Sequence, residues 1–206
     1  MMLPSPPLLV ISDRGQARRP LVEIAEAVFR AGCRWFSLRE KDLPADERRD
    51  LLRRLVVLGR RYGATVTVHE DIAAAVAAGA DGVHLPGGGD PARARRLLPS
   101  GLIGVSAHTP QEAAAQLAAG ADYVTLSPIF LTQSKPGYGP AVGLDALAAA
   151  ALLAPGPVVA LGGIDGANIA ACLAAGARGI AVMGEIMRAA DPEAATSRLL
   201  EALGPR

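Results

Sequence analysis

A short sequence motif occurs four times along the chain and constrains its fold more than any other feature. In each copy a glycine follows a helix-like stretch and is followed within two residues by Asp or Arg, then by a run of strand-forming residues; the glycines are Gly32, Gly79, Gly120 and Gly176. Glycine has no Cβ atom, so it readily adopts the left-handed conformation that ends many helices. Each copy therefore predicts a junction where a helix ends and a strand begins.

Further strand candidates lie between these junctions, and another opens the chain. The eight candidates are residues 8–12, 35–38, 65–68, 82–85, 102–105, 123–126, 158–161 and 179–182. Apolar residues recur at helical spacing in 21–31, 51–58, 72–78, 111–119, 144–153 and 168–175. Strands alternating with helices predict an α/β protein, a parallel (β/α)₈ TIM barrel with residues 1–206 as one domain. A doubly wound open sheet is the alternative.

The charge balance argues against nucleic acid as a partner. The chain has 21 basic and 20 acidic residues and a formal net charge of +1, so it has no overall field to attract polyanions. Arginines cluster within 48–61, but acidic residues at 46, 47 and 50 interleave with them and aromatic residues are scarce, as expected of a solvated helix face. An anionic ligand must therefore be bound by a local site.

The chain also lacks membrane and secretion signals. Residues 146–164 carry no charge, but Pro155 and Pro157 interrupt this stretch, so we expect no membrane span. The amino terminus has no signal-peptide pattern, which predicts a cytoplasmic protein. Cys33 and Cys172 lie in apolar stretches, and we expect buried small side chains rather than a disulfide. A homo-oligomer is left open.

The loop after the second strand carries two cations. In a barrel of this class the chemistry gathers at the carboxyl ends of the strands. If the strand ends near residue 38, Arg39 and Lys41 share one side of the extended chain and face the barrel mouth together. Such a pair suits a di- or triphosphate. The alternative is a solvated turn, because Glu40 and Asp42 nearly neutralise the loop.

Three later loops have the composition of phosphate sites. After the sixth strand, Thr132 and Ser134 supply two hydroxyls and Lys135 adds a charge. After the seventh and eighth strands, Gly163 and the pair Met183–Gly184 allow backbone amides to approach a phosphomonoester closely. Ordinary turn glycines are the alternative for these last two loops.

Carboxylates at the third and fourth loops are candidate ligands for Mg²⁺. Glu70, Asp71 and Asp90 follow these strands, and one pair would suffice because Mg²⁺ takes its other ligands from phosphate and water. Asp71 and Asp90 also stand where a helix begins, so each is an alternative helix cap, and capping is the preferred interpretation for Asp71.

The three histidines, His69, His84 and His108, all lie near strand ends. There an imidazole serves either as a general acid or base or as a hydrogen-bonded polar residue above the core, and the structural role is the more common one. The three do not have the spacing of zinc ligands on a helix, so a zinc site is not expected.

Taken together and in this order, the loops resemble the thiamine-phosphate synthase family and its thiazole tautomerase relatives, the TenI proteins. The resemblance runs from Ile11 to about Pro192. The phrases that carry it are Leu38-Arg39-Glu40-Lys41, Gly79-Ala80-Asp81-Gly82-Val83-His84-Leu85, Gly104-Val105-Ser106-Ala107-His108-Thr109, Gly120-Ala121-Asp122-Tyr123-Val124, Pro128-Ile129-Phe130-Leu131-Thr132-Gln133-Ser134-Lys135 and Pro157-Val158-Val159-Ala160-Leu161-Gly162-Gly163-Ile164.

The resemblance implies a transferase that joins hydroxymethylpyrimidine diphosphate to a thiazole phosphate and releases diphosphate. It implies a catalytic set of Arg39, Lys41, Ser106, His108 and Lys135. The implied substrate-binding set is Ser37, His69, Thr132, Ser134, Gly163, Met183 and Gly184, with Mg²⁺ held by Glu70 and Asp90. The expected partners are small phosphorylated substrates.

This chain departs from the usual synthase pattern at four places. It has Ser37 in place of Gln, His69-Glu70 in place of Asn-Asp, Pro86-Gly87-Gly88-Gly89-Asp90 in place of Gly-Gln-Glu-Asp, and Gly184 in place of Ser. Two alternatives therefore stay open beside the synthase. One is a tautomerase in which His108 or Glu70 moves a proton, and the other is a non-catalytic paralogue that binds a phosphorylated ligand.

Overall fold

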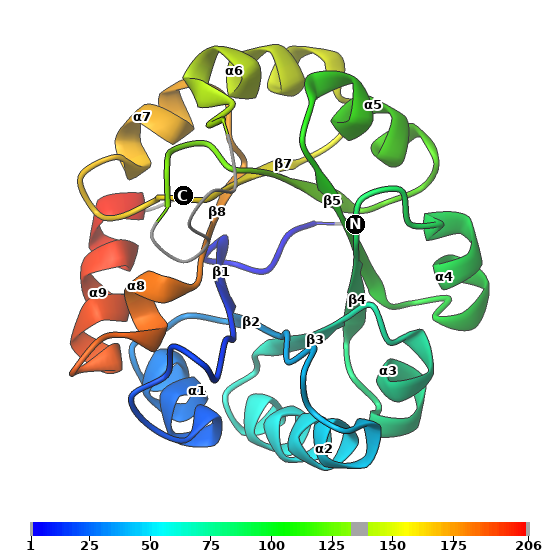
Figure 1. Ribbon diagram of the computed structural model, residues 1–206, viewed down its shortest axis with the longest axis vertical. Coiled ribbons are helices and arrows are strands. Elements are labelled where there is room, and N and C mark those ends of the chain that lie inside the picture. Colours follow the sequence, from blue (N-terminus) through cyan, green and yellow to red (C-terminus); the bar gives the residue numbers. More distant parts are fainter. Residues whose placement is uncertain (1, 133–139, 205–206) are drawn as a thin grey trace.

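The computed structural model describes residues 2–132 and 140–204, in which eight parallel strands form a closed barrel in chain order (Figure 1). The strands are β1 (Leu8–Ile11), β2 (Trp35–Leu38), β3 (Thr65–His69), β4 (Gly82–Leu85), β5 (Leu102–Ala107), β6 (Tyr123–Leu126), β7 (Val158–Leu161) and β8 (Gly179–Val182). β1 pairs with β8, with Leu8 opposite Ile180, so the barrel is closed. The predicted (β/α)₈ barrel is confirmed, and the open sheet is excluded.

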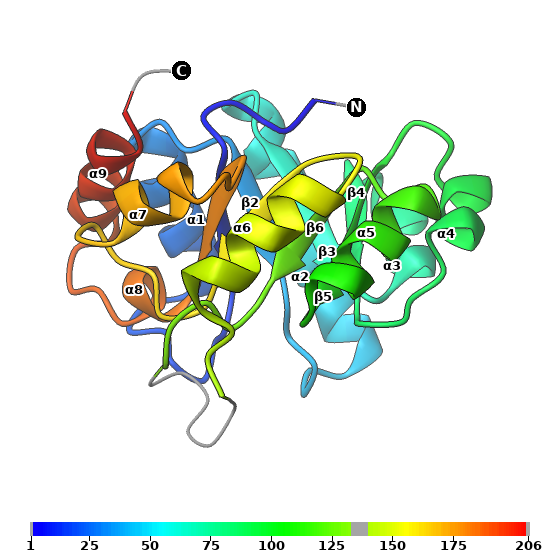
Figure 2. The same ribbon diagram turned by 90° about the horizontal axis from the view of Figure 1, so that it is seen from above.

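Helices surround the strands on the outside, as the two ribbon views show (Figures 1 and 2). They are α1 (Leu21–Arg30), α2 (Ala45–Arg61), α3 (Ile72–Ala78), α4 (Pro91–Leu97), α5 (Pro110–Ala118), α6 (Gly143–Leu153), α7 (Ile169–Ala174), α8 (Gly184–Met187) and α9 (Pro192–Leu203). In the described part of the chain, none of them combines the length and apolar character needed to cross a membrane. Both cysteines are free and buried, as predicted.

Helix boundaries differ from the prediction mainly where polar residues begin a helix. α2 begins at Ala45 rather than near residue 51, because its first turn is polar and carries Asp46 and Glu47, which suit a helix amino terminus. The periodic patterns also do not predict α8 and α9. α9 begins with Asp191 as cap and Pro192 in the first turn, a start signal that apolar periodicity does not detect.

The repeated sequence motif connects a helix to the amino-terminal end of the next strand in each copy. All four glycines have positive φ, between 62° at Gly79 and 103° at Gly32. The Asp of the motif makes a hydrogen bond to a neighbouring strand: Asp81 accepts one from the Val66 amide at 2.7 Å, and Asp122 accepts one from the Ile103 amide at 2.7 Å. The repeat therefore fastens neighbouring strands at the end of the barrel opposite the expected site.

Alternate residues of each strand point into the barrel, and their sizes are complementary. An apolar cluster that includes Trp35 and Tyr123 fills the amino-terminal half, where these two rings meet edge to face at 4.8 Å. A Cβ atom on Gly104 would lie 2.1 Å from the Tyr123 ring, so only glycine leaves room for this tyrosine. Polar residues occupy the same inward positions further along the strands and thus reach the mouth.

Candidate active site

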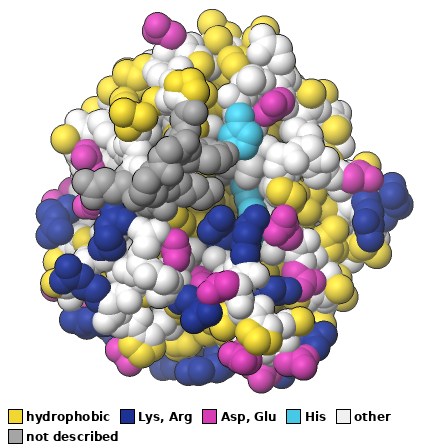
Figure 3. All heavy atoms as spheres, viewed as in Figure 1, with side chains coloured by type: hydrophobic (Ala, Val, Ile, Leu, Met, Phe, Trp, Pro, Cys, Tyr) yellow, Lys and Arg dark blue, Asp and Glu magenta, His cyan; other side chains and the backbone are white. Residues whose placement is uncertain are grey.

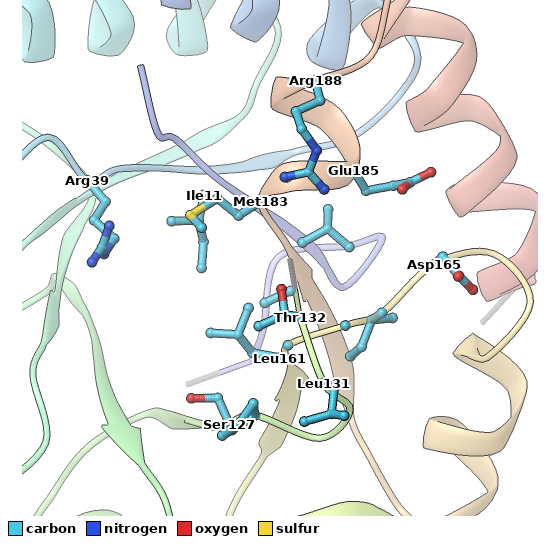
Figure 4. A pocket seen from close by; sticks show the side chains of 17 residues that line it. Ile11, Arg39, Ser127, Leu131, Thr132, Leu161, Asp165, Met183, Glu185 and Arg188 are labelled. Carbon is cyan, nitrogen blue, oxygen red and sulfur yellow. The ribbon is translucent and has the colours of Figure 1, made fainter. Parts of the chain in front are cut away.

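A pocket of about 340 Å³ opens at the carboxyl ends of the strands (Figure 4). The carboxyl ends of β1, β7 and β8 and the segments that follow β2, β6, β7 and β8 contribute to its wall. Its lining residues are Ile11, Arg39, Ser127, Pro128, Leu131, Thr132, Leu161, Gly162, Gly163, Ile164, Asp165, Ala181, Val182, Met183, Gly184, Glu185 and Arg188. Figure 3, which looks onto this face, shows Lys or Arg and His side chains gathered near its centre with acidic side chains around them.

The two cations of the second loop take different positions at the mouth. β2 ends at Leu38, as predicted, and the partly buried Arg39 lines the pocket. Lys41 is half exposed, and its Nζ lies 3.5 Å from Glu70 Oε2. Arg39 therefore offers a guanidinium to a ligand in the pocket, whereas Lys41 stands beside a carboxylate on the neighbouring loop.

Glu40, between these cations, does not behave as part of a solvated turn. It is 3% exposed and accepts hydrogen bonds from the Ser12 hydroxyl at 2.6 Å and from the Arg14 amide at 3.0 Å. Burial raises the pKa of the Glu40 carboxyl, although these two hydrogen bonds act in the opposite direction. The solvated-turn interpretation is wrong for this residue, because the loop after β1 covers it.

Of the three residues predicted to bind phosphate in the loop after β6, one lies within the described part of the chain. Thr132 lines the same pocket as Arg39. Ser134 and Lys135 lie outside the described residues. The expected convergence of Lys135 with Arg39 therefore stays a prediction.

The glycines of the seventh and eighth loops line the pocket, but at least one has a packing reason of its own. Gly163 has φ +64°, and a Cβ atom there would lie 2.5 Å from the carbonyl oxygen of Leu131. Close contact between the segments after β6 and β7 therefore requires glycine at this position. Met183 and Gly184 line the same pocket, at the start of α8.

Arg188 is a pocket residue that no sequence pattern predicts. It follows α8, lines the pocket, and its guanidinium donates to the side-chain oxygen of Gln16. Figure 4 shows Arg39 and Arg188 on different sides of the pocket. The only sequence signal is an arginine shortly after the last strand, which resembles many surface arginines.

The candidate metal ligands are partly committed to other contacts. Asp71 caps α3 by accepting from the Ala74 amide at 2.8 Å, as the preferred interpretation has it, and Asp90 caps α4 through the Arg93 amide at 2.8 Å. Glu70 is half exposed and lies near Lys41 and His69. Within residues 2–132 and 140–204, no group of three or more His, Cys, Asp or Glu side chains could hold a metal ion.

A hydrogen-bonded network occupies the barrel interior below the mouth. His84 Nδ1 lies 3.0 Å from the Tyr123 hydroxyl, and its Nε2 lies 3.0 Å from Ser106 Oγ and 3.3 Å from Thr125 Oγ1. His69 stacks on His84 with ring centroids 5.8 Å apart. Burial, followed by the charges of His69 and Arg39, lowers the pKa of His84 to about 3. The imidazole is therefore neutral, as a hydrogen-bonded structural histidine should be.

The remaining predicted residues flank this network. Ser37 is buried in β2, beside Thr67 of β3 in the sheet. The Nδ1 atom of the partly buried His108 lies 2.8 Å from the carbonyl oxygen of Ser127, so this nitrogen carries the proton and donates. Ser106 is also partly buried and contacts His84. Together with the pocket, these residues place most of the predicted site at one end of the barrel.

The fold and the pocket define a class of protein: a (β/α)₈ barrel with a polar site, lined in part by arginine side chains, at the carboxyl ends of its strands. Residues 8–186 match the family model described as thiamine monophosphate synthase. The chain belongs to this family.

Sequences and a solved structure agree with this assignment. The chain is 41% identical to the thiamine-phosphate synthase of Roseiflexus sp., over 92% of this chain and 82% of that protein. It is 40% identical to the thiamine-phosphate synthase of Moorella thermoacetica, over 94% and 93% of the two chains. The structure of thiamine phosphate pyrophosphorylase from Pyrococcus furiosus is similar, with a TM-score of 0.86 and 32% identity over 95% of this chain and 94% of that one.

Proposed function

We propose that this protein is a thiamine-phosphate synthase, a transferase that joins hydroxymethylpyrimidine diphosphate to a thiazole phosphate and releases diphosphate. The observation that carries the proposal is the pocket that Arg39 and Thr132 line together, with Lys41 two residues after Arg39 in the same loop. A guanidinium, an ammonium and a hydroxyl suit the oxygens of a diphosphate. The names of the relatives support the same reaction.

The arrangement favours departure of the diphosphate before the new bond forms. The bond between the pyrimidine methylene carbon and the diphosphate oxygen breaks, and both electrons leave with the diphosphate. Arg39, Lys41 and Lys135 stabilise the departing charge, as prearranged electrostatic groups do in other enzymes. The thiazole nitrogen then donates its lone pair to the methylene cation, which the pyrimidine ring stabilises. No general base is needed.

Mg²⁺ as a cofactor is part of the proposal. Glu70 and Asp90 fit an ion that receives most of its ligands from the substrate. Glu70 offers a half-exposed carboxylate, and the helix cap of Asp90 uses one of its two carboxylate oxygens. Bound there, Mg²⁺ would neutralise diphosphate oxygens. We therefore propose Glu70 and Asp90 as its protein ligands.

The second substrate would place its phosphate on the other side of the pocket. Gly163, Met183 and Gly184 line that side and bring backbone close to it, and the Arg188 guanidinium adds a cation. The thiazole ring would then lie between this phosphate subsite and the diphosphate subsite at Arg39. Ser37, His69 and Ser106 are proposed to contact the pyrimidine, because they lie at or near the ends of β2, β3 and β5.

One observation favours a tautomerase as the second candidate. The bond from His108 Nδ1 to the Ser127 carbonyl orients the imidazole, and an imidazole can move the proton that a reaction on a thiazole carboxylate phosphate requires. This candidate predicts metal-independent isomerisation that His108→Ala abolishes.

The deciding experiment gives the purified protein both phosphorylated precursors and Mg²⁺ and measures thiamine phosphate by fluorescence after oxidation. We expect product, and we expect Lys135→Ala to lower the rate by about 100-fold because it removes a cation from the leaving group. No product, under conditions where a control synthase turns over, would reject the proposal. Isomerisation of the thiazole without metal would then identify the tautomerase.

A further inference from the structure

Glu40 presents an electrostatic contradiction at the proposed site. In the sequence, Glu40 stands between the two cations that are proposed to bind diphosphate, and the residue is only 3% exposed. A negative charge beside a diphosphate weakens binding by repulsion, and burying a carboxylate has its own cost. Charge alone therefore argues against Glu at this position, and its contacts must provide the reason for it.

Those contacts form a chain of hydrogen bonds that ends on Arg39. The Arg39 backbone N–H donates to Ser12 Oγ at 2.8 Å, and the Ser12 hydroxyl donates in turn to Glu40 Oε1 at 2.6 Å. The Arg14 amide donates to the same carboxylate from the other side. Ser12 is fully buried, so its hydroxyl has protein groups as partners. The Glu40 carboxylate accepts the Ser12 hydroxyl proton, and the Ser12 oxygen accepts the hydrogen bond from the Arg39 amide.

We propose that Glu40 is a positioning residue that holds the Arg39 backbone in place through Ser12 and so aims the Arg39 guanidinium into the pocket. Arg39 and Glu40 point in opposite directions from the extended chain that follows β2. Fastening Glu40 to the β1 loop therefore orients Arg39 toward the mouth. This inference rests on the proposed function, because it assigns Arg39 to the diphosphate.

Two variants that change the loop charge equally distinguish positioning from electrostatics. Glu40→Gln and Asp42→Asn each remove one negative charge, and both keep the size of the side chain. Asp42 is exposed and forms an ion pair with Arg14 on the surface. Repulsion alone predicts tighter diphosphate binding in both variants, whereas positioning predicts weaker binding in Glu40→Gln only, because the Gln amide presents N–H groups where the carboxylate accepted hydrogen bonds.

The measurement is isothermal titration of each full-length variant with inorganic pyrophosphate in the presence of Mg²⁺. We expect the dissociation constant to rise about tenfold in Glu40→Gln, since small displacements of a binding group have effects of this size or larger. Ser12→Ala keeps the charge but breaks the chain, so its constant should rise as well. Asp42→Asn should bind at least as tightly as the unaltered protein.

The stoichiometry of the titration separates positioning from loss of folded protein. A variant that merely folds less completely shows fewer sites per chain with an unchanged dissociation constant. If Glu40→Gln does not fold, Ser12→Ala decides alone, and an unchanged constant overturns the inference.

Failure of the proposed function gives a different result. If the unaltered protein binds no pyrophosphate, the diphosphate site and the inference fall together. If it binds pyrophosphate and Glu40→Gln binds equally or more tightly, only the inference is overturned.

Discussion

Arg39 is the residue whose side chain the proposed chemistry uses most directly. It lines the pocket on one side and Arg188 lines it on another, so a ligand with two anionic groups would meet a guanidinium at each end (Figure 4). A guanidinium presents a planar fork of N–H groups that matches two phosphate oxygens, whereas an ammonium acts as a point charge.

Replacing Arg39 by Lys tests whether this fork matters. We expect kcat/KM for the diphosphate substrate to fall about tenfold, which is roughly 1.4 kcal/mol, because the charge stays and the paired hydrogen bonds are lost. Steady-state kinetics with varied pyrimidine substrate measures the change. Arg49→Lys, on the exposed side of α2 beside Asp46, is the matched control and should leave kcat/KM unaltered. Equal values for both variants would contradict a directional role of Arg39.

His84 makes the stability of the protein depend on pH. Burial holds its pKa near 3 in the folded protein, whereas the unfolded chain takes up a proton at the ordinary value of 6.5. Since the unfolded state binds more protons between these values, stability is lost as the pH falls below about 6.5. From pH 7 to pH 5 this one residue should lower the free energy of unfolding by about 2 kcal/mol.

The check is urea unfolding of the unaltered protein and of His84→Gln at pH 7 and pH 5. The variant should be less stable at pH 7, because it disturbs the hydrogen bonds to Tyr123 and Ser106. It should also lose less stability between the two pH values. Parallel losses in both proteins would show that His84 is not held neutral by the fold.

At the scale of elements, the site depends on how the segments after β6 and β7 pack together. The Phe130 amide donates to the Gly162 carbonyl at 3.0 Å, and Ile129 donates to Leu161 at 2.9 Å. These bonds continue the pairing of β6 and β7 beyond the strands. They hold one wall of the pocket at the distance that only glycine at position 163 permits.

Gly163→Ala should therefore move this wall. Its Cβ atom would approach the Leu131 carbonyl oxygen and the Phe130 backbone below 3 Å in a left-handed conformation, so we expect a loss of about 2–3 kcal/mol in unfolding free energy and weaker binding of the thiazole phosphate. Gly88→Ala is the control, because it shares a positive φ but would meet nothing within 4 Å; it should lose about 1 kcal/mol. Equal losses in the two variants would contradict a packing requirement at Gly163.

At the scale of the whole molecule, the barrel separates stability from chemistry. The amino-terminal ends of the strands carry the repeated Asp contacts, and the carboxyl ends carry the pocket. Asp122 makes two such contacts: it accepts a hydrogen bond from the Ile103 amide and forms an ion pair with Arg95 at 2.7 Å. Removing it leaves a strand amide without its acceptor.

Asp122→Ala should lower the free energy of unfolding by about 2 kcal/mol, because a backbone donor loses its partner. Its kcat/KM should equal that of the unaltered protein, since the pocket is at the other end of the barrel. Urea unfolding and steady-state kinetics provide the two measurements. Asp46→Ala, which removes an exposed carboxylate on α2, should change stability by no more than about 0.5 kcal/mol. A large loss of kcat/KM in Asp122→Ala would show that the two ends are coupled.

Much of the fold was predictable because it follows from local patterns. Strand boundaries depend on runs of β-branched residues, and helix ends depend on neighbours within a few positions, such as Asp71 capping α3. Alternation along β2 also placed Arg39 at the mouth. The polar starts of α2 and α9 were missed because apolar periodicity does not describe a solvated first turn.

Local sequence patterns are sufficient to predict the order of the strands and of most helices, the parallel barrel and the end of the barrel where polar side chains collect. The burial of Glu40, the neutral state of His84 within its network and the approach of Arg188 to the pocket all depend on the three-dimensional arrangement of the chain. Arg14 and Glu40 are 26 residues apart, and Tyr123 and His84 are 39 apart. Burial and hydrogen bonding of such groups depend on which segments closure of the barrel brings together, and no local pattern carries that information.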